Sequence, residues 1–347
     1  MPILHNLLEP EALVRHFQEN PPQDFEVLRL ESGTPAFTTP FDLLTTATPS
    51  LRNGVKKLPM FQRWSPFLRP RSAFIGTTVS EYALLSAAVS PEELVREIGD
   101  TLCHDHPFVI IKDLPTDAAL VREEDLAVSV AVAEACRGAG FVLMEGQALA
   151  YVPIDFSSVD ELIARRSPAR RKNIRRKLRS RAGMQIDDIA LGDPRFFDAP
   201  FLASLYAMYL DVYRQSELHF DLLMPSFFRS VLQDAGIDGV VFTYRVGGVL
   251  IGYNLCVGAD ERLIDKYVGF VYPAAREHNL YAVSWFHNLE YARARGLRCY
   301  VAGWTDREVK RELGASFTFT RHAVYVRNPI VRGVLRTLKR SFESDHD

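Results

Sequence analysis

The chain has 347 residues, of which 47% are hydrophobic and 24% are charged, and its formal net charge is −2. This composition excludes wholesale disorder, and the length is sufficient for two domains with a sizeable core. Ten of the 41 Lys and Arg residues lie between Arg165 and Arg181, so the rest of the chain carries a net charge of −12 (−2 − 10). Such local basic charge argues against a protein that coats nucleic acid generally, and no DNA partner is expected.

The four cysteines, Cys103, Cys136, Cys256 and Cys299, form no CxxC pair and have no Cys/His spacing that suits zinc. A reduced compartment, no metal and no tightly bound cofactor are therefore expected. The first residues lack the basic start and apolar core of a signal peptide, and no run of about 18 apolar residues occurs. We expect a cytoplasmic protein with no transmembrane segment.

In the first half of the chain, strand-like segments alternate with helix-like ones, which predicts a mixed α/β layer. The stretch 35–70 is rich in Pro, Thr and Arg without either periodicity, and is interpreted as a long excursion that could line a site. The predicted strands are 25–30, 72–79 and 108–114, the predicted helices are 91–102 and 123–140, and 141–146 with 148–154 are predicted to form a hairpin.

The second half repeats this plan. Gly247-Gly248 is a strong signal for a tight turn between two strands. The predicted strands are 184–189, 239–247, 248–258, 262–271, 297–303 and 317–326, and the predicted helices are 200–216, 225–236, 279–296 and 307–314.

The segment RRSPARRKNIRRKLRSR (165–181) predicts a basic helix of about fifteen residues, which starts with Ser167 as N-cap and Pro168 at the first helical position and ends near Gly183. Only Ile174 and Leu178 provide an apolar stripe. Arg170, Arg171 and Lys172 crowd the first turn, where the helix dipole disfavours cations, so an anionic partner is expected for them and for Arg175.

The order helix, helix, hairpin, third strand, long helix, strand, short helix, strand resembles the GNAT acyltransferase fold. Three features are similar to the Fem-type tandem-GNAT N-acyltransferases, which include peptidoglycan aminoacyl transferases: the basic segment RRKNIRRKLR, the run GVLIGYNLCVGADERLIDKYVGF and the run GLRCYVAGWTDREVKRELGASF. The resemblance covers roughly residues 157–326. It implies two tandem GNAT-like domains, a degenerate one at 1–156 and a catalytic one at 184–347, joined by a basic helix at 157–183.

The resemblance also implies an N-acyltransferase that moves an acyl or aminoacyl group from a carrier to an amine. Acetyl-CoA-dependent GNAT enzymes usually carry a glycine-containing loop before the long helix, and YPAAREHNLYAVSW has neither glycine. That departure favours aminoacyl-tRNA over acyl-CoA as co-substrate, with tRNA held by the basic helix. Arg276 and Asn279 in this stretch, and Trp304, are candidate substrate contacts.

Direct N-acyl transfer needs a base for the amine and donors for the developing oxyanion. The reacting centre is expected where the third strand splays from the next, with Asp265 as general base and Tyr267 on the same face. The stretch YRQSELHFDLL adds Tyr213, Glu217 and His219 as acceptor contacts or bases, and Lys310 stands at the family's lysine position.

Each of these residues has a simpler interpretation. Asp265 and Lys266 could be ordinary surface charges, His219 a packed residue, and Lys310 a structural one. The basic helix could be solvated, lie on an anionic membrane surface, or pair with Glu123, Glu124 and Asp125. The alternative functions are an acyl-CoA-dependent enzyme acting on a small amine, and a non-catalytic module that binds RNA or an anionic surface.

Overall fold

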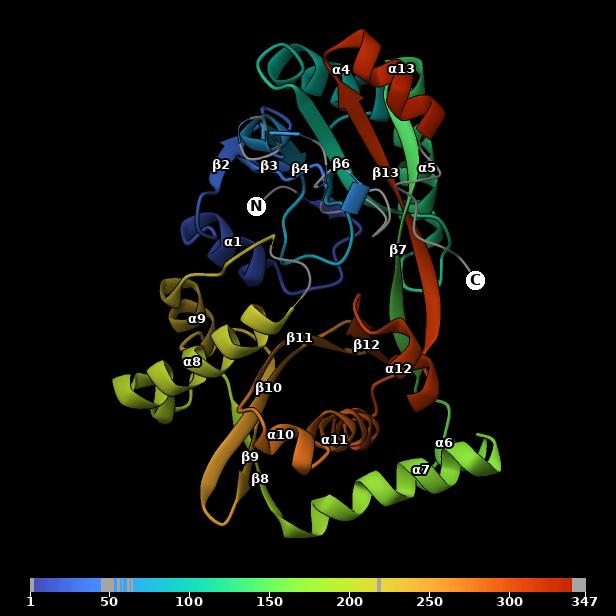
Figure 1. Ribbon diagram of the computed structural model, residues 1–347. Helices are drawn as coiled ribbons and strands as arrows, with labels where there is room; N and C mark the ends of the chain where they lie inside the picture. Colours follow the sequence, from blue (N-terminus) through green and yellow to red (C-terminus); the bar gives the residue numbers. More distant parts are fainter. Residues whose placement is uncertain are drawn as a thin grey trace. The chain divides into compact units, whose positions relative to one another are not determined.

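The computed structural model describes residues 3–44, 53–54, 57, 59–60, 63, 65–216 and 220–338. The chain folds into two compact units that interleave along the sequence (Figure 1). Unit 1 comprises residues 1–8, 21–148 and 318–347, and unit 2 comprises residues 9–20 and 149–317.

The elements of unit 1 include the two strands, β7 and β13, that carry the chain across its boundaries. They are β1 (Leu4–His5), β2 (Glu26–Arg29), β3 (Pro35–Pro40), a 3-10 turn (Ser65–Leu68), β4 (Arg71–Ile75), β5 (Leu85–Ser86), α4 (Pro91–Leu102), β6 (Phe108–Pro115), α5 (Glu123–Gly138), β7 (Val142–Pro153), β13 (Ser316–Val326) and α13 (Pro329–Leu338).

Unit 2 contains most of the helices. Its elements are α1 (Glu11–Glu19), α6 (Val159–Ala164), α7 (Pro168–Leu178), a 3-10 turn (Arg179–Gly183), β8 (Met184–Ala190), a second 3-10 turn (Pro194–Phe197), α8 (Ala199–Gln215), α9 (Pro225–Leu232), β9 (Gly239–Val246), β10 (Val249–Ala259), β11 (Arg262–Phe270), α10 (Ala274–Glu277), α11 (Leu280–Ala294), β12 (Cys299–Gly303) and α12 (Arg307–Leu313).

Both units share one strand plan. In unit 1, β2, β3 and β4 are antiparallel neighbours, and β4 pairs in parallel with β6 after the crossover helix α4. In unit 2, β8, β9, β10 and β11 are antiparallel neighbours, and β11 pairs in parallel with β12 after α11. A parallel pair needs such a crossover, which is why each unit places a helix at this point.

Each unit is completed by a strand from the other half of the sequence. The second part of β13, from Thr320 to Val326, pairs with β6 in unit 1. The end of β7, from Ala150 to Pro153, pairs with β12 in unit 2. The last strand of each half of the sequence is therefore exchanged.

The mixed α/β fold class is confirmed, and most predicted elements are present within one to four residues of their expected ends. Gly247 and Gly248 adopt φ values of 56° and 82°, as the predicted tight turn requires. The predicted domain division at residues 156 and 183 stays a prediction. The same holds for the linking role of the basic segment, whose helix α7 lies inside unit 2.

Two predictions in the first half were wrong. Residues 141–154 form no hairpin but the single strand β7, because Gly146 provides close approach instead of a turn: a Cβ there would lie 2.1 Å from Oγ1 of Thr320. The excursion 35–70 begins with the regular strand β3, and much of its remainder lies outside the described residues.

Helices cover both faces of the sheet in unit 2. Gly269 of β11 faces α8, since a Cβ on it would lie 2.8 Å from Cβ of Met208. Asn254 of β10 faces α11, because its side chain meets that of Asn288 in a short hydrogen bond. The core between the sheet and α11 includes fully buried Phe242 and Phe286.

We predict that Gly269→Ala lowers the free energy of unfolding by about 1–3 kcal/mol, because the new methyl group would overlap the ring of Tyr253 and the side chain of Met208. Urea unfolding measures this change. Gly183→Ala is the matched control, since a Cβ there meets nothing within 4 Å, and it should leave stability unchanged. Equal midpoints for the two variants would contradict this packing.

Candidate active site

Strand β11 separates from β12 halfway along its length. The two strands pair only at Arg262–Cys299, Leu263–Tyr300 and Ile264–Val301, whereas β10 continues to pair with β11 as far as Phe270. Backbone N–H and C=O groups on the β12 side of residues 265–270 therefore have no β12 partner. This opening is the splay that the sequence predicted beside the third strand.

A bulge in β11 lies at the start of this opening. Cys256 pairs with Asp265 and Leu255 pairs with Tyr267, so Lys266 is an extra residue in the strand. The bulge places Asp265 and Tyr267 on opposite faces. The expectation that they share a face was therefore wrong, since strict alternation holds only in an uninterrupted strand.

The carboxylate of Asp265 accepts two hydrogen bonds on the α11 side of the sheet. Asn254 donates from Nδ2 to Oδ1 at 2.6 Å, and the hydroxyl of Tyr300 donates to Oδ2 at 2.7 Å. Asn288 of α11 in turn donates to the hydroxyl of Tyr300 at 3.1 Å. Because Asn254, Tyr300 and Asn288 are fully buried while Asp265 is half-buried, the network holds the carboxylate from beneath.

Burial fixes the protonation state of the groups beside Asp265. Desolvation raises the pKa of the Tyr300 phenol well above its ordinary value, and the charge of Asp265 raises it further. Burial likewise raises the pKa of the Cys256 thiol. Tyr300 is therefore a stable hydrogen-bond donor, and Cys256 is not poised as a nucleophile.

Tyr267 faces the aromatic side chains of α8 and α9. Its ring centroid lies 5.6 Å from that of Phe228, 6.0 Å from that of Phe227 and 6.4 Å from that of Tyr209. Tyr213, another candidate on α8, is half-buried with its ring 6.1 Å from that of Tyr209. Tyr267 and Tyr213 thus belong to one aromatic cluster, which the sequence did not indicate.

Lys266 forms a buried ion pair that sequence reasoning missed. Its Nζ lies 3.3 Å from Oε1 of Glu9, and the two side chains are 5% and 0% exposed. Glu9 directly precedes α1, more than 250 residues away in sequence, so no local pattern could reveal it. Since breaking a buried pair leaves an uncompensated charge, this contact ties α1 to the bulge.

Lys310 lies at the other side of the opening. Its Nζ is buried and donates to the carbonyl of Ala302 at 2.6 Å. Ala302 is the first residue of β12 beyond its last pair with β11, as Asp265 is on β11. Asp265 and Lys310 therefore flank the point where the strands part.

The remaining candidates lie in separate places of unit 2. Arg276 of α10 donates to Gln215 at 3.0 Å and stacks 4.9 Å above the ring of Tyr272. Asn279, which precedes α11, has a left-handed φ of 52° and donates to the hydroxyl of Ser180 at 3.1 Å.

Trp304 is half-buried after β12. Glu217 and His219 lie outside the described residues. The described geometry thus assembles Asp265 and Lys310 around the opening, and it gives no such placement for Glu217 and His219.

Helix α7 presents an exposed basic surface. Ile174 is its buried residue, and Leu178 packs against the core, as predicted. Within unit 2, no described acidic residue is within ion-pair distance of seven of its cations or those just after it. These are Arg170, Arg171, Lys172, Arg175, Arg176, Lys177 and Arg179.

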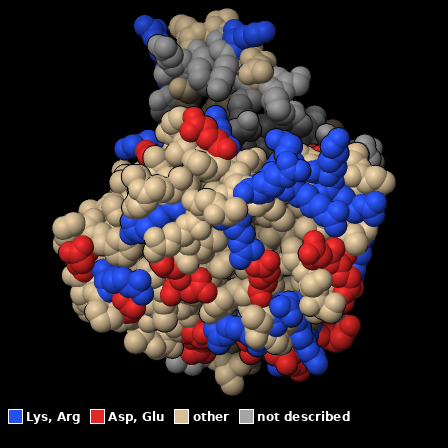
Figure 2. Space-filling view, turned by 90° about the horizontal axis from the view of Figure 1, so that it is seen from below, with Lys and Arg blue, Asp and Glu red and all other residues tan. Residues whose placement is uncertain are grey.

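Figure 2 shows Lys and Arg side chains gathered in a contiguous patch on the side of the molecule that carries α7. Pairing of α7 with Glu124 and Asp125 is not observed, because both bind Arg122 within unit 1. Ser167 occupies the N-cap position, but its side chain does not cap the helix.

Comparisons with known proteins agree with this architecture. Residues 168–311 match the family model of the acetyltransferase (GNAT) domain, so this part of the chain is a GNAT domain and the protein is an acyltransferase. No curated protein sequence gives a significant match. In the part of the chain that the structure describes, no helix is long and apolar enough to cross a membrane.

Solved structures with the same fold cover nearly the whole chain. One is the C-terminal domain of a protein assigned as a lysylphosphatidylglycerol synthetase from Agrobacterium fabrum, with a TM-score of 0.56, 12% identity, and coverage of 94% of this chain and 89% of that one. L-PGS from Bacillus licheniformis has a TM-score of 0.55, 11% identity and coverage of 98% and 99%. FemX has a TM-score of 0.51, 11% identity and coverage of 94% and 98%. The Fem-like tandem-GNAT fold is thereby confirmed.

We predict that Lys310→Met lowers the free energy of unfolding by about 1–3 kcal/mol, because it leaves the carbonyl of Ala302 without the Nζ donor in a buried place. Urea unfolding monitored by circular dichroism measures the loss. Lys172→Met makes the same change at an exposed position and should be neutral. Equal stability of both variants would show that the Lys310 contact contributes nothing.

Proposed function

We propose that the protein transfers an acyl or aminoacyl group from a carrier to an amine at the opening between β11 and β12 of unit 2. The observation that carries this proposal is the position of Asp265, a half-buried carboxylate fixed by two donors at the first residue of the opening. Unpaired edges of strands bind extended ligands through backbone hydrogen bonds, so residues 265–270 suit the acyl arm of a carrier.

Asp265 is assigned the role of general base. It would take the proton of the attacking ammonium, and the amine would then attack the carbonyl carbon of the donor directly, with no covalent enzyme intermediate. Backbone N–H groups of β11 beyond the bulge, together with Lys310, would stabilise the oxyanion. Tyr267 and Tyr213 would line the acceptor side, with Glu217 and His219 as further candidates there.

Two features support aminoacyl-tRNA as the donor. Seven cations on and just after α7 have no acidic partner in the described part of unit 2, which suits contact with a phosphate backbone. The connection from β11 to α11 holds the helical turn α10 and Asn279 in place of a glycine loop, which makes close approach of a pyrophosphate harder.

Acyl-CoA is the second candidate donor, because the matching family model is that of acetyltransferases. Titration calorimetry with CoA separates the two. Binding at micromolar CoA would favour acyl-CoA, whereas no binding of CoA together with binding of charged tRNA supports the proposal.

Asp265→Asn should lower kcat about 10²- to 10⁴-fold with little change in KM for the donor, because the amide cannot accept the proton. Steady-state kinetics with charged tRNA or acyl-CoA and an amine acceptor measures the change. Asp260→Asn is the matched control: Asp260 lies in the exposed turn before β11 with a left-handed φ of 44°, which asparagine tolerates. Unchanged kcat in folded Asp265→Asn would remove this residue from the mechanism.

Neutralising α7 should reduce the salt dependence of tRNA binding. For Arg170→Gln/Arg175→Gln we expect the slope of log K against log salt concentration to fall by about 1.5, since each lost phosphate contact contributes about 0.7 to 0.9. Filter binding at several salt concentrations measures the slope. Arg229→Gln/Arg293→Gln removes the same charge from other exposed positions of unit 2, and an equal fall in this variant would contradict a specific role for α7.

A further inference from the structure

The C-terminal helix α13 is strongly amphipathic, and its apolar side is turned to solvent. Ile330 is 76% exposed, Val334 52% and Val331 44%. On a helical wheel these three side chains occupy one face, and Arg332 and Arg336 lie on the other. A surface helix of a globular domain normally places these faces the other way round.

The cations of α13 hold the helix on unit 1. Arg332 lies 4.4 Å from the centroid of the Tyr325 ring, and its Nε donates to the carbonyl of Val326 at 2.7 Å. Arg336 donates to the carbonyl of Gly140 at 3.5 Å. The orientation of α13 is therefore fixed by specific contacts of its polar side, which leave the apolar side outward.

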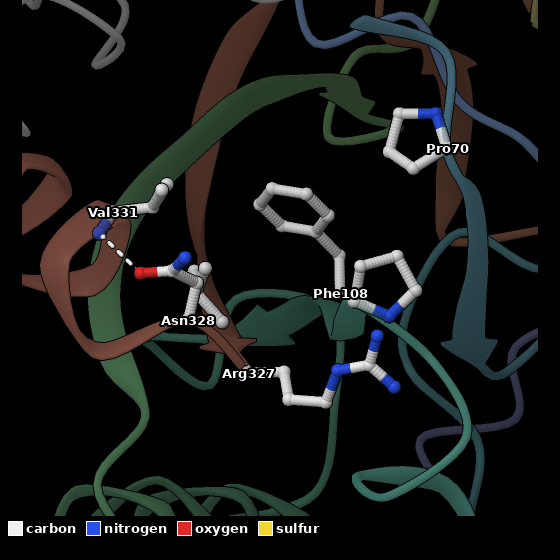
Figure 3. Close-up of a pocket in the computed structure, with 7 residues that line it drawn as sticks. Pro70, Phe108, Arg327, Asn328 and Val331 are labelled. Carbon is white, nitrogen blue, oxygen red and sulfur yellow. Dashed lines mark hydrogen bonds between the residues drawn. The ribbon is translucent and has the colours of Figure 1, made fainter. Parts of the chain in front are cut away.

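A hollow at the foot of α13 extends this apolar surface. Phe108, Pro70 and Val331 line it, with Asn328 and Arg327 at its rim (Figure 3). Asn328 accepts the N–H of Val331 at 3.2 Å and so fixes the first turn of the helix. The valine thus joins the hollow to the exposed face formed by Ile330 and Val334.

The charge around this surface has one sign. From residue 313 to 342 the sequence contains six cations and no Asp or Glu. Within unit 1, no described acidic residue forms an ion pair with Arg327, Arg332 or Arg336. An exposed apolar helix face bordered by cations is typical of a helix that lies in the interface of an anionic membrane.

We propose that α13 docks the protein on an anionic lipid bilayer, with Ile330, Val331 and Val334 entering the region between headgroups and acyl chains. Phosphate headgroups would be held by Arg327 and by the cations that follow along the helix. This contact is reversible, because a short helix with three apolar anchors binds only with the help of electrostatic attraction. The proposal is independent of the donor used for acyl transfer.

Flotation of the full chain with vesicles tests the docking. We expect binding to phosphatidylglycerol/phosphatidylcholine vesicles, at least about tenfold weaker binding to pure phosphatidylcholine, and a loss of binding at high salt. Ile330→Asp/Val334→Asp should weaken binding to the anionic vesicles about tenfold or more, since it removes two anchors and adds repulsion. Thermal unfolding should stay unchanged in this variant, because both side chains are exposed.

Val130→Asp is the matched control. Val130 is 49% exposed on α5 of the same unit, and its substitution should leave vesicle binding intact. Absence of binding by the wild type would overturn the proposal, as would full binding by Ile330→Asp/Val334→Asp, which would place the lipid contact elsewhere. A dimer in solution that this double variant dissolves, without vesicle binding, would assign the face to a second copy of the chain and also overturn it.

Discussion

The extra residue Lys266 in β11 is the constraint on which the candidate site depends. Without the bulge, Asp265 and Tyr267 would share a face of the sheet, and only one of the two helical layers could contribute to the opening. With it, Asp265 reaches Asn254 and Tyr300 on the α11 side, while Tyr267 enters the aromatic cluster of α8 and α9. The displaced Lys266 is satisfied by the buried carboxylate of Glu9.

The end of the pairing between β11 and β12 provides the second requirement. Strand edges inside a sheet normally have no free hydrogen-bonding capacity, so a ligand can be added only where two strands part. In unit 2 this point coincides with the bulge on one side and with the Lys310–Ala302 contact on the other. A carboxylate, an ammonium group and a stretch of backbone donors are thus brought to one opening by topology.

Sequence patterns predicted the features that depend on neighbouring residues. The Gly247-Gly248 turn, the crossover helix before β12 and the thin apolar stripe of α7 all follow from local periodicity or backbone freedom, and all are present. Gly146 was misread, because a glycine needed for close approach to Thr320 has the same local pattern as one needed for a turn.

The contacts that define the site could not be predicted in this way. The Lys266–Glu9 pair and the hydrogen bonds of Asp265 join residues distant in sequence, and a bulge leaves no mark in a run such as RLIDKYVGF. Helix α13 was missed because its apolar residues were not considered apart from the last strand, and its outward apolar face depends on the contacts of Arg332 and Arg336 with unit 1.

Hydrogen exchange measured by mass spectrometry, with and without the donor, tests the central claim most directly. The account predicts that charged tRNA, or acyl-CoA if that is the carrier, slows amide exchange in peptides covering residues 265–272 of β11. Exchange in the paired residues 109–111 of β6 should not change. Slower exchange elsewhere in the chain with none in residues 265–272 would contradict an active site at the opening between β11 and β12.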